Sequence, residues 1–599
     1  MKKLFLTIMA MAIAIGSYAI DEPKWKLDLD KKAEWLKITS AGIVIVATNT
    51  SLVAIDPDKQ AKLYEIKGAT IADQEKFQEI DGTSFAIYES TSLTSIKAQT
   101  TIIDYFTGRI IYNSGEANVS ILNKKPLLEI GSILLEIKQD KKAVLTLVNI
   151  QSGKESWRMD LPDRKTGFNL GALKQSIKSM LDAEPVADIE GNILFPDDKK
   201  LHRLDARTGA KLWTKEYEKS VGRLNFSDDG TVVYVGSGKF IGALSLSDGK
   251  DVWKNSVKIN GEFQMFIPTV NNKMYCVTSS QIQLIDQVTG SLSWKKPATL
   301  DQPFIELRFT NKGIVVMGGD DKTSTFDYIG FDGNSFWKRS YRTDKPVVNF
   351  AIVSKGVLFA NAEEANMIDL NTGDDSIWKK RIKLKGSPIT FLDEKIGLIY
   401  ADQKLYRVNL SDVTYQLIVE DIKFKGSDED VQKIEVRENG YLLRSQQNAW
   451  LISPDGKVIY SKYYAPASIG TAGKILGVMG QVYATVDNLE VTQDPNKPNT
   501  FNIQRSKKGD DIVHGIGDVI ANRKNSFQSQ EALYIMTRIE DGATKRTGMV
   551  KLNKNTGNEE GRILLKTLEP IYQVDYATGN LFVIVNGSVS GSEFSCFGL

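Results

Sequence analysis

The sequence is poor in the residues that catalytic and metal sites most often use. Its two cysteines, Cys276 and Cys596, are 320 positions apart in a chain of 599 residues, so they cannot form a disulfide framework. A bridge between them remains open, although the strand-like run around Cys276 favours a buried free thiol. The two histidines, His202 and His514, each stand alone. We expect structural or surface histidines rather than metal ligands, and neither lies near a serine elbow.

An excess of charge of one sign is also missing. The chain has 76 Lys+Arg and 74 Asp+Glu, a formal net charge of +2. That balance argues against a nucleic-acid partner. Hydrophobic residues at 42% and aromatic residues at 9% are typical of a folded globular chain. The length is too great for one ordinary hydrophobic core, so the chain is expected to contain several structural units.

No apolar run is as long as the ~18 residues of a membrane span. The first nineteen residues combine a charged start at Lys2-Lys3, a short apolar run over 4–15 and small residues at 17–19. This pattern predicts a cleavable signal peptide over 1–19 and a mature chain that starts at Ile20. No cysteine follows the apolar run, which disfavours a lipid anchor. We therefore expect a periplasmic or extracellular protein without a transmembrane span.

The sequence does contain a repeat, in which Asp-x-x-Thr-Gly is followed by tryptophan. It is seen in RLDARTGAKLW (203–213), LIDQVTGSLSW (284–294) and MIDLNTGDDSIW (367–378). From Asp205 to Ile452 the successive steps are 40, 41, 43, 40, 40 and 43 residues. Periods near ~40 with strand-like content are typical of β-propeller blades. The aligned positions are Asp56, Asp104, Asn149, Asp205, Ser245, Asp286, Ile329, Asp369, Asn409, Ile452 and Asn553.

Each residue type of the repeat has a structural explanation. Glycine in the turn can take a positive φ without steric cost, and the aspartate can accept backbone N–H bonds across the turn. In three units the turn is Asp-Gly instead, at 248–249, 332–333 and 455–456. The tryptophans are expected on the outermost strand, buried between neighbouring sheets, so we interpret the repeat as a scaffold. Six of the nine tryptophans share this register: Trp157, Trp213, Trp253, Trp294, Trp337 and Trp378.

These residues resemble the PQQ-repeat, or quinoprotein-like, β-propeller family, whose docking motif has the form Ala-x-Asp-x-x-Thr-Gly-x-x-x-Trp. The match is good at 205–213 and 286–294 and looser at 369–378. It is degenerate at 104–112, where Tyr112 replaces the tryptophan. The resemblance covers about 25–460 and implies an all-β propeller of four-stranded blades. It says little about chemistry.

The number of repeats raises the question of how many rings they form. Eleven repeats exceed the four to eight blades of an ordinary propeller, and the period breaks between Asn149 and Asp205 and between Ile452 and Asn553. We therefore predict two rings, of about seven and about six blades, with short helical insertions; the alternative is one eight-bladed ring with decorations. The predicted segments are 20–165 (first part of a discontinuous propeller), 166–185 (helical insertion), 186–465 (second propeller) and 466–599 (linker helix and remainder of the discontinuous propeller).

The two ends of the chain carry complementary strand patterns. Residues 23–29 provide a tryptophan-bearing strand with nothing before it, and the segment from 580 onwards provides strands without a following tryptophan. Pairing the two segments would cover exposed strand edges. We predict that the termini close the discontinuous ring in this way.

An enzymatic alternative is implied by the resemblance, a PQQ-dependent alcohol or sugar dehydrogenase. The alcohol-dehydrogenase branch clamps its quinone with adjacent cysteines, which Cys276 and Cys596 cannot supply, and no Cys-x-x-Cys-His haem attachment motif is present. The sequence therefore assigns no catalytic residue, no metal ligand and no cofactor. Residues that would bind a cofactor are unknown.

Other motifs have structural explanations. The glycine-rich segments 233–242 and 470–477 lack the first glycine and the Ser/Thr of a phosphate loop. The basic clusters 378–386 and 505–511 are interpreted as solvated strand edges, and the apolar stripe of a helix at 169–181 as packing on its own ring. Four acidic pairs fall in expected turns and lack the spacing of a calcium loop: Asp228-Asp229, Asp320-Asp321, Asp374-Asp375 and Asp510-Asp511.

The sequence as a whole favours an exported, non-enzymatic propeller that binds another envelope protein or protein complex as a scaffold or adaptor, through loops held on rigid blades. Within the resemblance, the functional analogue is the propeller subunit of bacterial outer-membrane protein assembly. That analogue has a lipobox cysteine and one eight-bladed ring, and this sequence predicts neither. The alternatives are a quinoprotein-type oxidoreductase and a cell-surface carbohydrate- or peptide-binding protein. The oligomeric state is left undetermined.

Overall fold

The computed structural model of the protein describes most of the repeat region. The predicted signal peptide over 1–19, most of the predicted helical insertion over 166–185 and the predicted linker helix after 466 lie outside the described residues. The described residues are 22–70, 73–92, 98–161, 183–269, 271–393, 395–427, 429–467, 489–493, 501–505, 519–520, 522–523, 526, 531–541, 544–568, 570–587 and 591–598.

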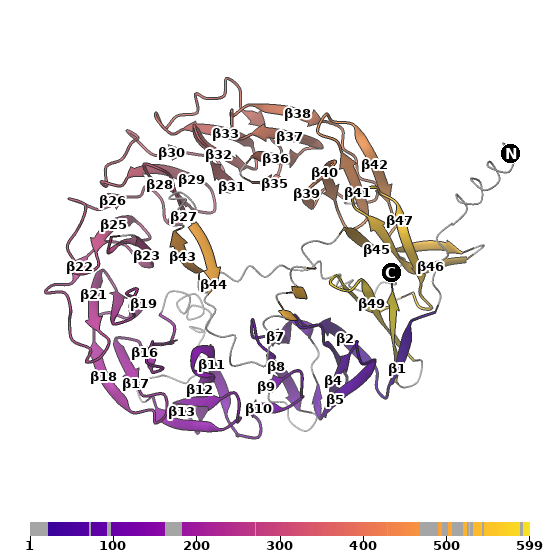
Figure 1. Cartoon of the computed structure of the whole chain (residues 1–599), viewed down its shortest axis with the longest axis horizontal. Coiled ribbons are helices and arrows are strands. Elements are labelled where there is room, and N and C mark those ends of the chain that lie inside the picture. Colours follow the sequence, from indigo (N-terminus) through magenta and orange to yellow (C-terminus); the bar gives the residue numbers. More distant parts are fainter. Residues whose placement is uncertain are drawn as a thin grey trace, which may run out of the picture.

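The chain forms a single ring of twelve blades (Figure 1). In the described residues, ten blades are four-stranded sheets, one has five strands and one has three. The prediction of an all-β propeller with four-stranded blades is confirmed. The prediction of two rings is wrong, and so is the alternative of eight blades. We number the blades 1 to 12 in the order of their first strands along the ring, beginning with the sheet of β2.

The bounds of the strands in the first eight blades follow the repeat closely. Blades 1 to 4 comprise β2–β5 (Ala33–Ile38, Val44–Thr48, Ser51–Asp56, Ala61–Lys67), β6–β10 (Ala69–Thr70, Phe77–Glu79, Phe85–Ser92, Ala98–Asp104, Ile110–Asn113), β11–β14 (Ser120–Leu127, Ser132–Gln139, Lys142–Asn149, Glu155–Asp160) and β15–β18 (Val186–Ala187, Ile193–Asp197, Lys200–Leu204, Lys211–Glu216). Blades 5 to 8 comprise β19–β22 (Val221–Phe226, Val232–Ser237, Phe240–Ser245, Val257–Lys258), β23–β26 (Phe263–Thr269, Lys273–Thr278, Gln281–Asp286, Ala298–Thr299), β27–β30 (Phe304–Phe309, Gly313–Gly319, Ser324–Gly330, Tyr341–Arg342) and β31–β34 (Val347–Ile352, Gly356–Asn361, Glu364–Asp369, Ile382–Lys383).

The last four blades include the sheet that joins both ends of the chain. Blades 9 to 12 comprise β35–β38 (Ile389–Leu392, Ile396–Ala401, Lys404–Asn409, Tyr415–Val419), β39–β42 (Lys433–Arg437, Gly440–Arg444, Asn448–Ile452, Val458–Tyr463), β45–β47 (Ala532–Asp541, Thr544–Asn553, Glu559–Leu564) and β48–β50 (Ile571–Asp575, Asn580–Asn586, Ser592–Gly598) with β1 (Trp25–Leu29). In the sequence between blades 10 and 11, β43 (Leu489–Gln493) and β44 (Phe501–Arg505) form a two-stranded antiparallel sheet.

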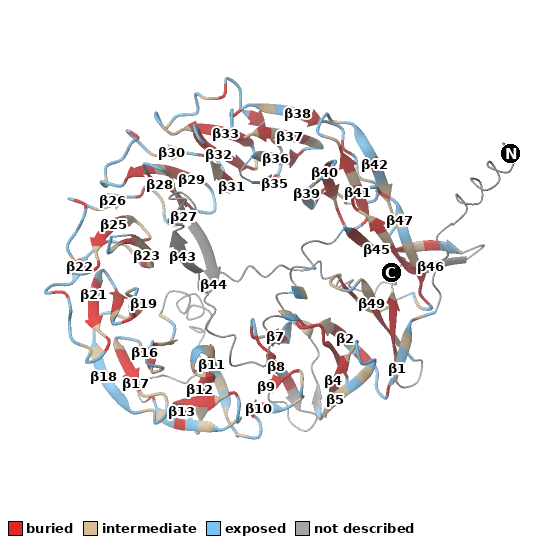
Figure 2. Cartoon of the chain, in the orientation of Figure 1, coloured by how far each residue is buried: buried red, intermediate tan, exposed pale blue. Residues whose placement is uncertain are grey.

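Within a four-stranded blade the strands are antiparallel and follow one another outward. The first strand lies nearest the ring axis and the fourth lies at the outer edge, as β35 to β38 show (Figure 1). The middle strands carry almost continuous apolar runs, such as VIVAT in β3 and GIVVMGG in β28, and all residues of these two strands are buried. Both faces of a middle strand are covered by neighbouring blades (Figure 2), so alternation of polar and apolar residues is lost. The hydrophobic core is therefore distributed between the blades.

The ring closes through both termini. Strand β1 pairs antiparallel with β50, with Trp25 opposite Cys596 and Leu29 opposite Ser592. Leu29 packs in one core with Phe582 and Phe594. The predicted pairing of the terminal segments is confirmed, in a single ring. It gives blade 12 its outermost strand and covers the edge of β50.

The two breaks in the repeat are insertions into one ring, which is why the two-ring prediction is wrong. Across the first break, the Trp157 indole of blade 3 lies over Gly209 of blade 4 and its Nε1 donates to the Ala206 carbonyl oxygen at 2.9 Å. Across the second break, the Tyr460 hydroxyl of blade 10 donates to the Lys554 carbonyl oxygen of blade 11 at 2.7 Å. Blade-to-blade contact continues at both points.

Helical structure is minor in the described residues. It includes two 3-10 turns, η1 (Gln74–Lys76) and η2 (Leu128–Ile130). Asp73 caps η1, because its side chain accepts a hydrogen bond from the Glu75 amide at 3.0 Å. In the described part of the chain, no helix has both the length and the apolar character needed to cross a bilayer.

Candidate functional site

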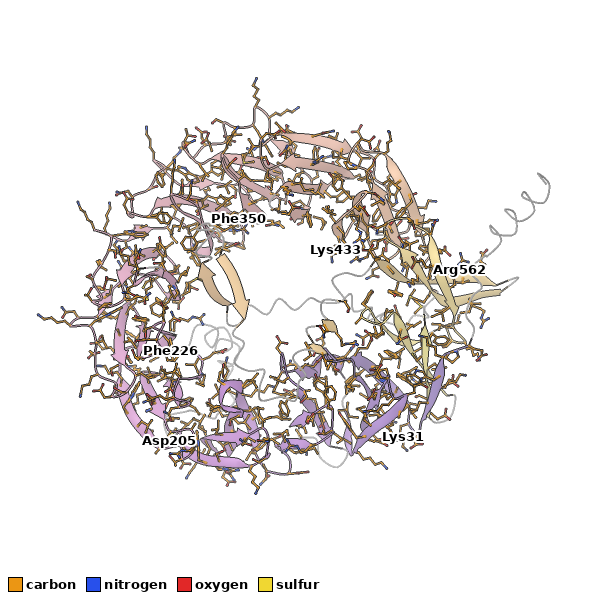
Figure 3. All side chains as sticks on the ribbon, viewed as in Figure 1. Lys31, Asp205, Phe226, Phe350, Lys433 and Arg562 are labelled. Atoms are coloured by element: carbon orange, nitrogen blue, oxygen red, sulfur yellow. The ribbon has the colours of Figure 1, made fainter. Side chains whose placement is uncertain are left out.

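The Asp-x-x-Thr-Gly segment forms the turn between the third and fourth strands of a blade. In blade 4, Asp205 Oδ1 accepts hydrogen bonds from the Arg207 and Thr208 amides at 2.9 Å each and from the Thr208 hydroxyl at 3.0 Å. These bonds hold the pKa of Asp205 below its ordinary value. Gly209 has a φ of +71°, a conformation that glycine adopts without steric cost. The predicted turn chemistry is confirmed, on the outer side of the ring (Figure 3).

The tryptophan of one blade docks on the turn glycine of the next. Trp213 Nε1 donates to the Leu246 carbonyl oxygen at 2.8 Å, and its ring lies over Gly249. A Cβ added at Gly249 would lie 2.7 Å from Trp213 Cδ2, so glycine also provides the space for the indole. The equivalent bonds to the next blade are Trp157–Ala206 (2.9 Å), Trp253–Gln287 (3.0 Å), Trp294–Phe331 (2.8 Å), Trp337–Leu370 (3.0 Å) and Trp378–Val413 (2.6 Å).

Some blades achieve the same docking with other residues. Tyr64 of blade 1 lies over Gly108 and donates to the Tyr105 carbonyl oxygen at 2.9 Å, and Tyr460 lies over Gly557. The expectation that the tryptophans lie on the outermost strand is confirmed for two of them, which lie in β14 and β18. Four precede a two-residue outer strand instead: Trp253, Trp294, Trp337 and Trp378.

A second row of contacts between blades lies on the innermost strands and was not predicted. Lys37 Nζ of blade 1 donates to the Phe77 carbonyl oxygen of blade 2 at 2.9 Å. In blade 7 the Arg308 guanidinium donates to the Phe350 carbonyl oxygen of blade 8 and lies 3.9 Å from the centre of the Phe350 ring. Arg223 Nε of blade 5 donates to the carbonyl oxygen of residue 264 at 3.1 Å. Lys37 and Arg308 are the fifth residues of their strands and Arg223 is the third, so position and residue type vary too much to form a sequence motif.

In three of the innermost strands a β-bulge leaves an apolar side chain exposed. Leu122, Ile305 and Val348 are each skipped in the pairing of the first strand with the second, in β11, β27 and β31. Their exposed fractions are 46%, 49% and 54%. A bulge redirects a side chain away from the regular sheet. These three residues, here called the bulge residues, lie on the strands nearest the ring axis and form a candidate contact surface.

A partly buried ion-pair network joins blades 10 and 11. Glu435 of β39 accepts from Arg444 Nε at 2.7 Å and from Lys554 Nζ of blade 11 at 3.0 Å. Burial by itself raises the pKa of Glu435, but the two cations outweigh burial and hold the pKa at about 2. The network therefore favours the ionised carboxylate and fastens the blade that follows the long insertion.

Replacing Glu435 by glutamine is expected to lower the free energy of unfolding by about 2 kcal/mol at pH 7. The lowered pKa means that the carboxylate stabilises the fold above its ordinary pKa of 4.5. This contribution is lost as the pH falls from 4.5 towards about 2, so wild type and variant should converge there. Urea unfolding at several pH values measures the difference. The matched control is Glu593→Gln, which removes an exposed ion pair with Lys26 and should change stability by less than about 0.5 kcal/mol. A difference that persists unchanged at low pH would contradict this account.

The histidine and cysteine residues that are described have structural surroundings. His202 is buried, and its Nδ1 lies 2.8 Å from the Thr214 hydroxyl oxygen. Burial and the contact with Thr214 are the surroundings of His202, and His514 lies outside the described residues. Cys276 and Cys596 are both free and buried, which confirms the expectation for Cys276. Burial raises the pKa of both thiols, that of Cys596 to about 11, so neither is set up as a nucleophile.

The acidic and glycine-rich motifs are turns. Asp320 accepts bonds from the Lys322 and Thr323 amides at 2.8 Å each, as expected for an acidic pair in a turn. Residues 233–242 form the hairpin of β20 and β21, so the strand expected after the glycine-rich segment is confirmed. Segments 470–477 and 505–511 lie almost entirely outside the described residues. Among the described residues, no cluster of three or more His, Cys, Asp or Glu side chains could hold a metal ion.

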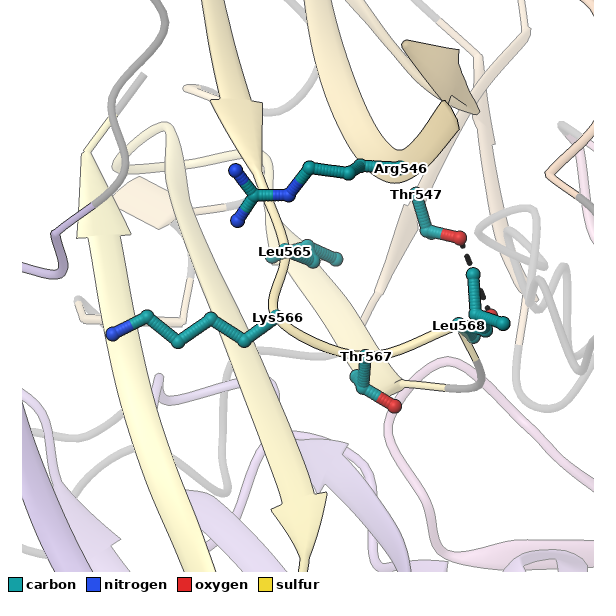
Figure 4. Close-up of a pocket in the computed structure, with 6 residues that line it drawn as sticks. All are labelled: Arg546, Thr547, Leu565, Lys566, Thr567 and Leu568. Atoms are coloured by element: carbon teal, nitrogen blue, oxygen red, sulfur yellow. Dashed lines mark hydrogen bonds between the residues drawn. The ribbon is translucent and has the colours of Figure 1, made fainter. Parts of the chain in front are cut away.

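One open pocket of about 260 Å³ lies on blade 11 (Figure 4). It is lined by Arg546, Thr547 and residues 565–568. The cationic ends of Arg546 and Lys566 extend to the same side (Figure 4), while Thr547 donates to the Leu568 carbonyl oxygen at 3.3 Å. The pocket lacks a carboxylate, an imidazole and a thiol among its lining residues. The Lys566 amine and the threonine hydroxyls therefore have no carboxylate or imidazole in the lining to activate them.

Comparison with protein families agrees with this geometry. Residues 140–241 and 197–416 match a family model described as outer membrane protein assembly factor BamB. This chain is a β-propeller, and its residues 140–416 resemble PQQ-type repeats. The matched part of the propeller runs from blade 3 to blade 9 and contains all six docked tryptophans. The resemblance recognised in the docking motif is thus confirmed.

Solved structures similar to this propeller have low sequence identity. The crystal structure of BamB from Moraxella catarrhalis is 14% identical, covering 58% of this chain and 97% of that one, with a TM-score of 0.30. The computationally designed Ika8 protein is 12% identical, covering 67% of this chain and 98% of that one, with a TM-score of 0.23. No curated protein sequence matches the propeller. We draw no functional conclusion from these values.

Proposed function

We propose that this protein is an exported, non-enzymatic propeller that binds another protein or protein complex of the cell envelope as a scaffold or adaptor. The observation that carries the proposal is how the recurrent side chains are used. The tryptophan, glycine and aspartate of the repeat join and shape the blades, while apolar bulge residues on the innermost strands stay exposed. Exposed apolar side chains held on a rigid framework suit protein binding.

Two further points support this function. The family model that matches residues 140–416 is described as an assembly factor of outer membrane proteins, a role in which one protein binds others. The predicted signal peptide over 1–19 supports export.

Photo-crosslinking in intact cells tests the proposal. A photoreactive amino acid is placed at Ile305 or Val348, and the matched control places it at Lys312, an exposed turn residue of blade 7. The expected result is a reproducible adduct with the same envelope protein from positions 305 and 348, identified by mass spectrometry, and no such adduct from 312. The absence of a reproducible adduct from either bulge position would contradict the proposal.

A cofactor titration tests the enzymatic alternative. The purified protein is mixed with PQQ and calcium, and quinone absorbance and dye reduction are followed. We expect no stoichiometric uptake and no dye reduction, because no adjacent cysteine pair is present to clamp the quinone. Stoichiometric uptake with turnover would replace the scaffold function with a redox function.

A further inference from the structure

Four consecutive blades carry a concentration of positive charge on the outer side of the ring. The segments 253–259, 294–300, 337–343 and 378–385 each begin at a docked tryptophan and contain twelve basic residues and no acidic residue. The net charge of the whole chain is only +2. We call these twelve residues the basic wall; all are exposed: Lys254, Lys258, Lys295, Lys296, Lys338, Arg339, Arg342, Lys379, Lys380, Arg381, Lys383 and Lys385.

The basic wall is weakly neutralised by the rest of the protein. Within the described chain, two of the twelve residues form an ion pair: Arg381 with Glu364 at 2.7 Å and Lys385 with Asp402 at 3.6 Å. The same register in blade 4, over 213–219, holds two basic and two acidic residues. The charge is therefore particular to blades 5 to 8 and is not a general property of the repeat.

The docked tryptophans also place exposed apolar side chains beside these cations. Val252, Leu292 and Phe336 precede the tryptophans of blades 5, 6 and 7 by one or two positions, and their exposed fractions are 43%, 45% and 47%. The tryptophan after each of them is buried, so the backbone at each position is held in place. Exposed apolar side chains thus lie within a few residues of these cations in three adjacent blades.

The outer strands of these blades limit how a partner can bind. β22, β26, β30 and β34 have two residues each, whereas β18 has six. Such short edge strands offer little backbone for the addition of another strand. Recognition here has to use the side chains. The wall is convex because it follows the outside of the ring over four blades (Figure 1), so a flat bilayer would contact only part of it.

We propose that the basic wall binds an extended acidic polypeptide segment that carries apolar side chains. The positive charge favours an anionic chain, and that chain has to be extended to follow the convex outside of the ring. The exposed apolar residues near the cations favour a polypeptide over a nucleic acid or an anionic lipid surface. This inference rests on the proposed function and names the chemistry of the partner.

Peptide binding to the purified full-length protein tests the inference. The probe is a fluorescein-labelled peptide of Glu-Leu-Asp-Phe-Gly-Ser repeats, followed by anisotropy at low and at physiological salt; the control peptide has Gln and Asn in place of Glu and Asp. The wall variant combines Lys295→Glu, Lys296→Glu, Lys338→Glu and Arg339→Glu. The control variant makes the same change in net charge at exposed turn residues of blades 7 to 9: Lys312→Glu, Lys322→Glu, Lys355→Glu and Lys395→Glu.

We expect the wall variant to bind the acidic peptide at least about tenfold more weakly than wild type, and the control variant to stay within about twofold. Binding should weaken as salt is raised, and the neutral peptide should not bind measurably. Equal binding by wild type and wall variant, or an equal loss in both variants, would overturn the inference. So would binding to phosphatidylglycerol vesicles or single-stranded DNA that depends on the wall while the acidic peptide fails to bind.

The outcomes separate this inference from the proposed function. If an adduct forms at Ile305 and Val348 but the wall variant binds the peptide as well as wild type, the scaffold function stands and the inference fails. If peptide binding depends on the wall while no adduct forms at the bulge residues, the inference stands and the proposed contact surface on the inner strands fails.

Discussion

Replacing Trp294 by alanine is expected to lower the free energy of unfolding by about 3–5 kcal/mol. The side chain is 2% exposed, its Nε1 donates to the Phe331 carbonyl oxygen at 2.8 Å, and its ring lies 5.7 Å from that of Tyr275 in an edge-to-face arrangement. Alanine removes this contact between blades 6 and 7 and leaves a cavity over Gly333. Urea unfolding followed by circular dichroism measures the loss.

Two variants control for other effects of the Trp294 substitution. Trp294→Phe keeps a ring but loses the N–H donor, so we expect a smaller loss of about 1–2 kcal/mol. Leu292→Ala changes a neighbouring residue that is 45% exposed and should alter stability by less than about 0.5 kcal/mol. If Trp294→Ala unfolds at the same urea concentration as wild type, the indole does not hold the blades together.

Deleting strand β1 is expected to destabilise the closed ring by about 5 kcal/mol. The deletion removes Trp25, Leu27 and Leu29 from the core that they form with the other strands of blade 12. Burying one apolar side chain completely stabilises a fold by about 1.5–3 kcal/mol. Trp25 and Leu27 contribute less than this because they are only partly buried. It also exposes the edge of β50. We compare a protein that starts at Lys32 with one that starts at residue 22. Thermal unfolding and limited proteolysis provide the measurement.

Adding back a synthetic peptide of residues 22–31 provides the matched control for the deletion. The peptide should restore protection of the β50 amides from hydrogen exchange, because all five residues of β1 pair with β50. A reversed-sequence peptide should not restore it. If the shorter protein is as stable and as resistant to protease as the longer one, the termini do not close the ring.

The local structure of the repeat could be predicted from the sequence because local chemistry decides it. The turn at 205–209 needs a residue with positive φ after an acceptor side chain, and Gly209 and Asp205 fill those positions. The docking of Trp213 needs a neighbour without a Cβ, and Gly249 provides it. Blade 9 differs, because Val413 takes a φ of +58° at the turn position where other blades have glycine.

The size of the ring could not be predicted in the same way. The motif sets the contact between one blade and the next, but ring size depends on the small angle between them, which the motif does not encode. Each of the eleven aligned positions lies at or beside the end of the strand that precedes a blade's outermost strand, from Asp56 in β4 to Asn553 in β46. In the twelfth blade the sequence Asp-x-x-Thr-Gly, at 575–579, lies between the first and second strands, and the other end of the chain supplies the outermost strand.

The candidate contact surface was also beyond sequence reasoning. The bulges at Leu122, Ile305 and Val348 follow from the pairing register of the first two strands, and no residue type marks them. The basic segment at 378–386 was visible in the sequence, but its alignment with the cations of three other blades requires the ring. Nothing in the sequence around Glu435 indicates that its ion-pair partner is Lys554, 119 positions away.

Electron microscopy of the purified protein tests the single ring most directly. Class averages viewed down the ring axis should show one annulus of twelve radial units with a continuous circumference. Two adjoining smaller annuli, or a single annulus of eight units, would contradict the structure and remove the arrangement of blades on which both the scaffold function and the basic wall depend.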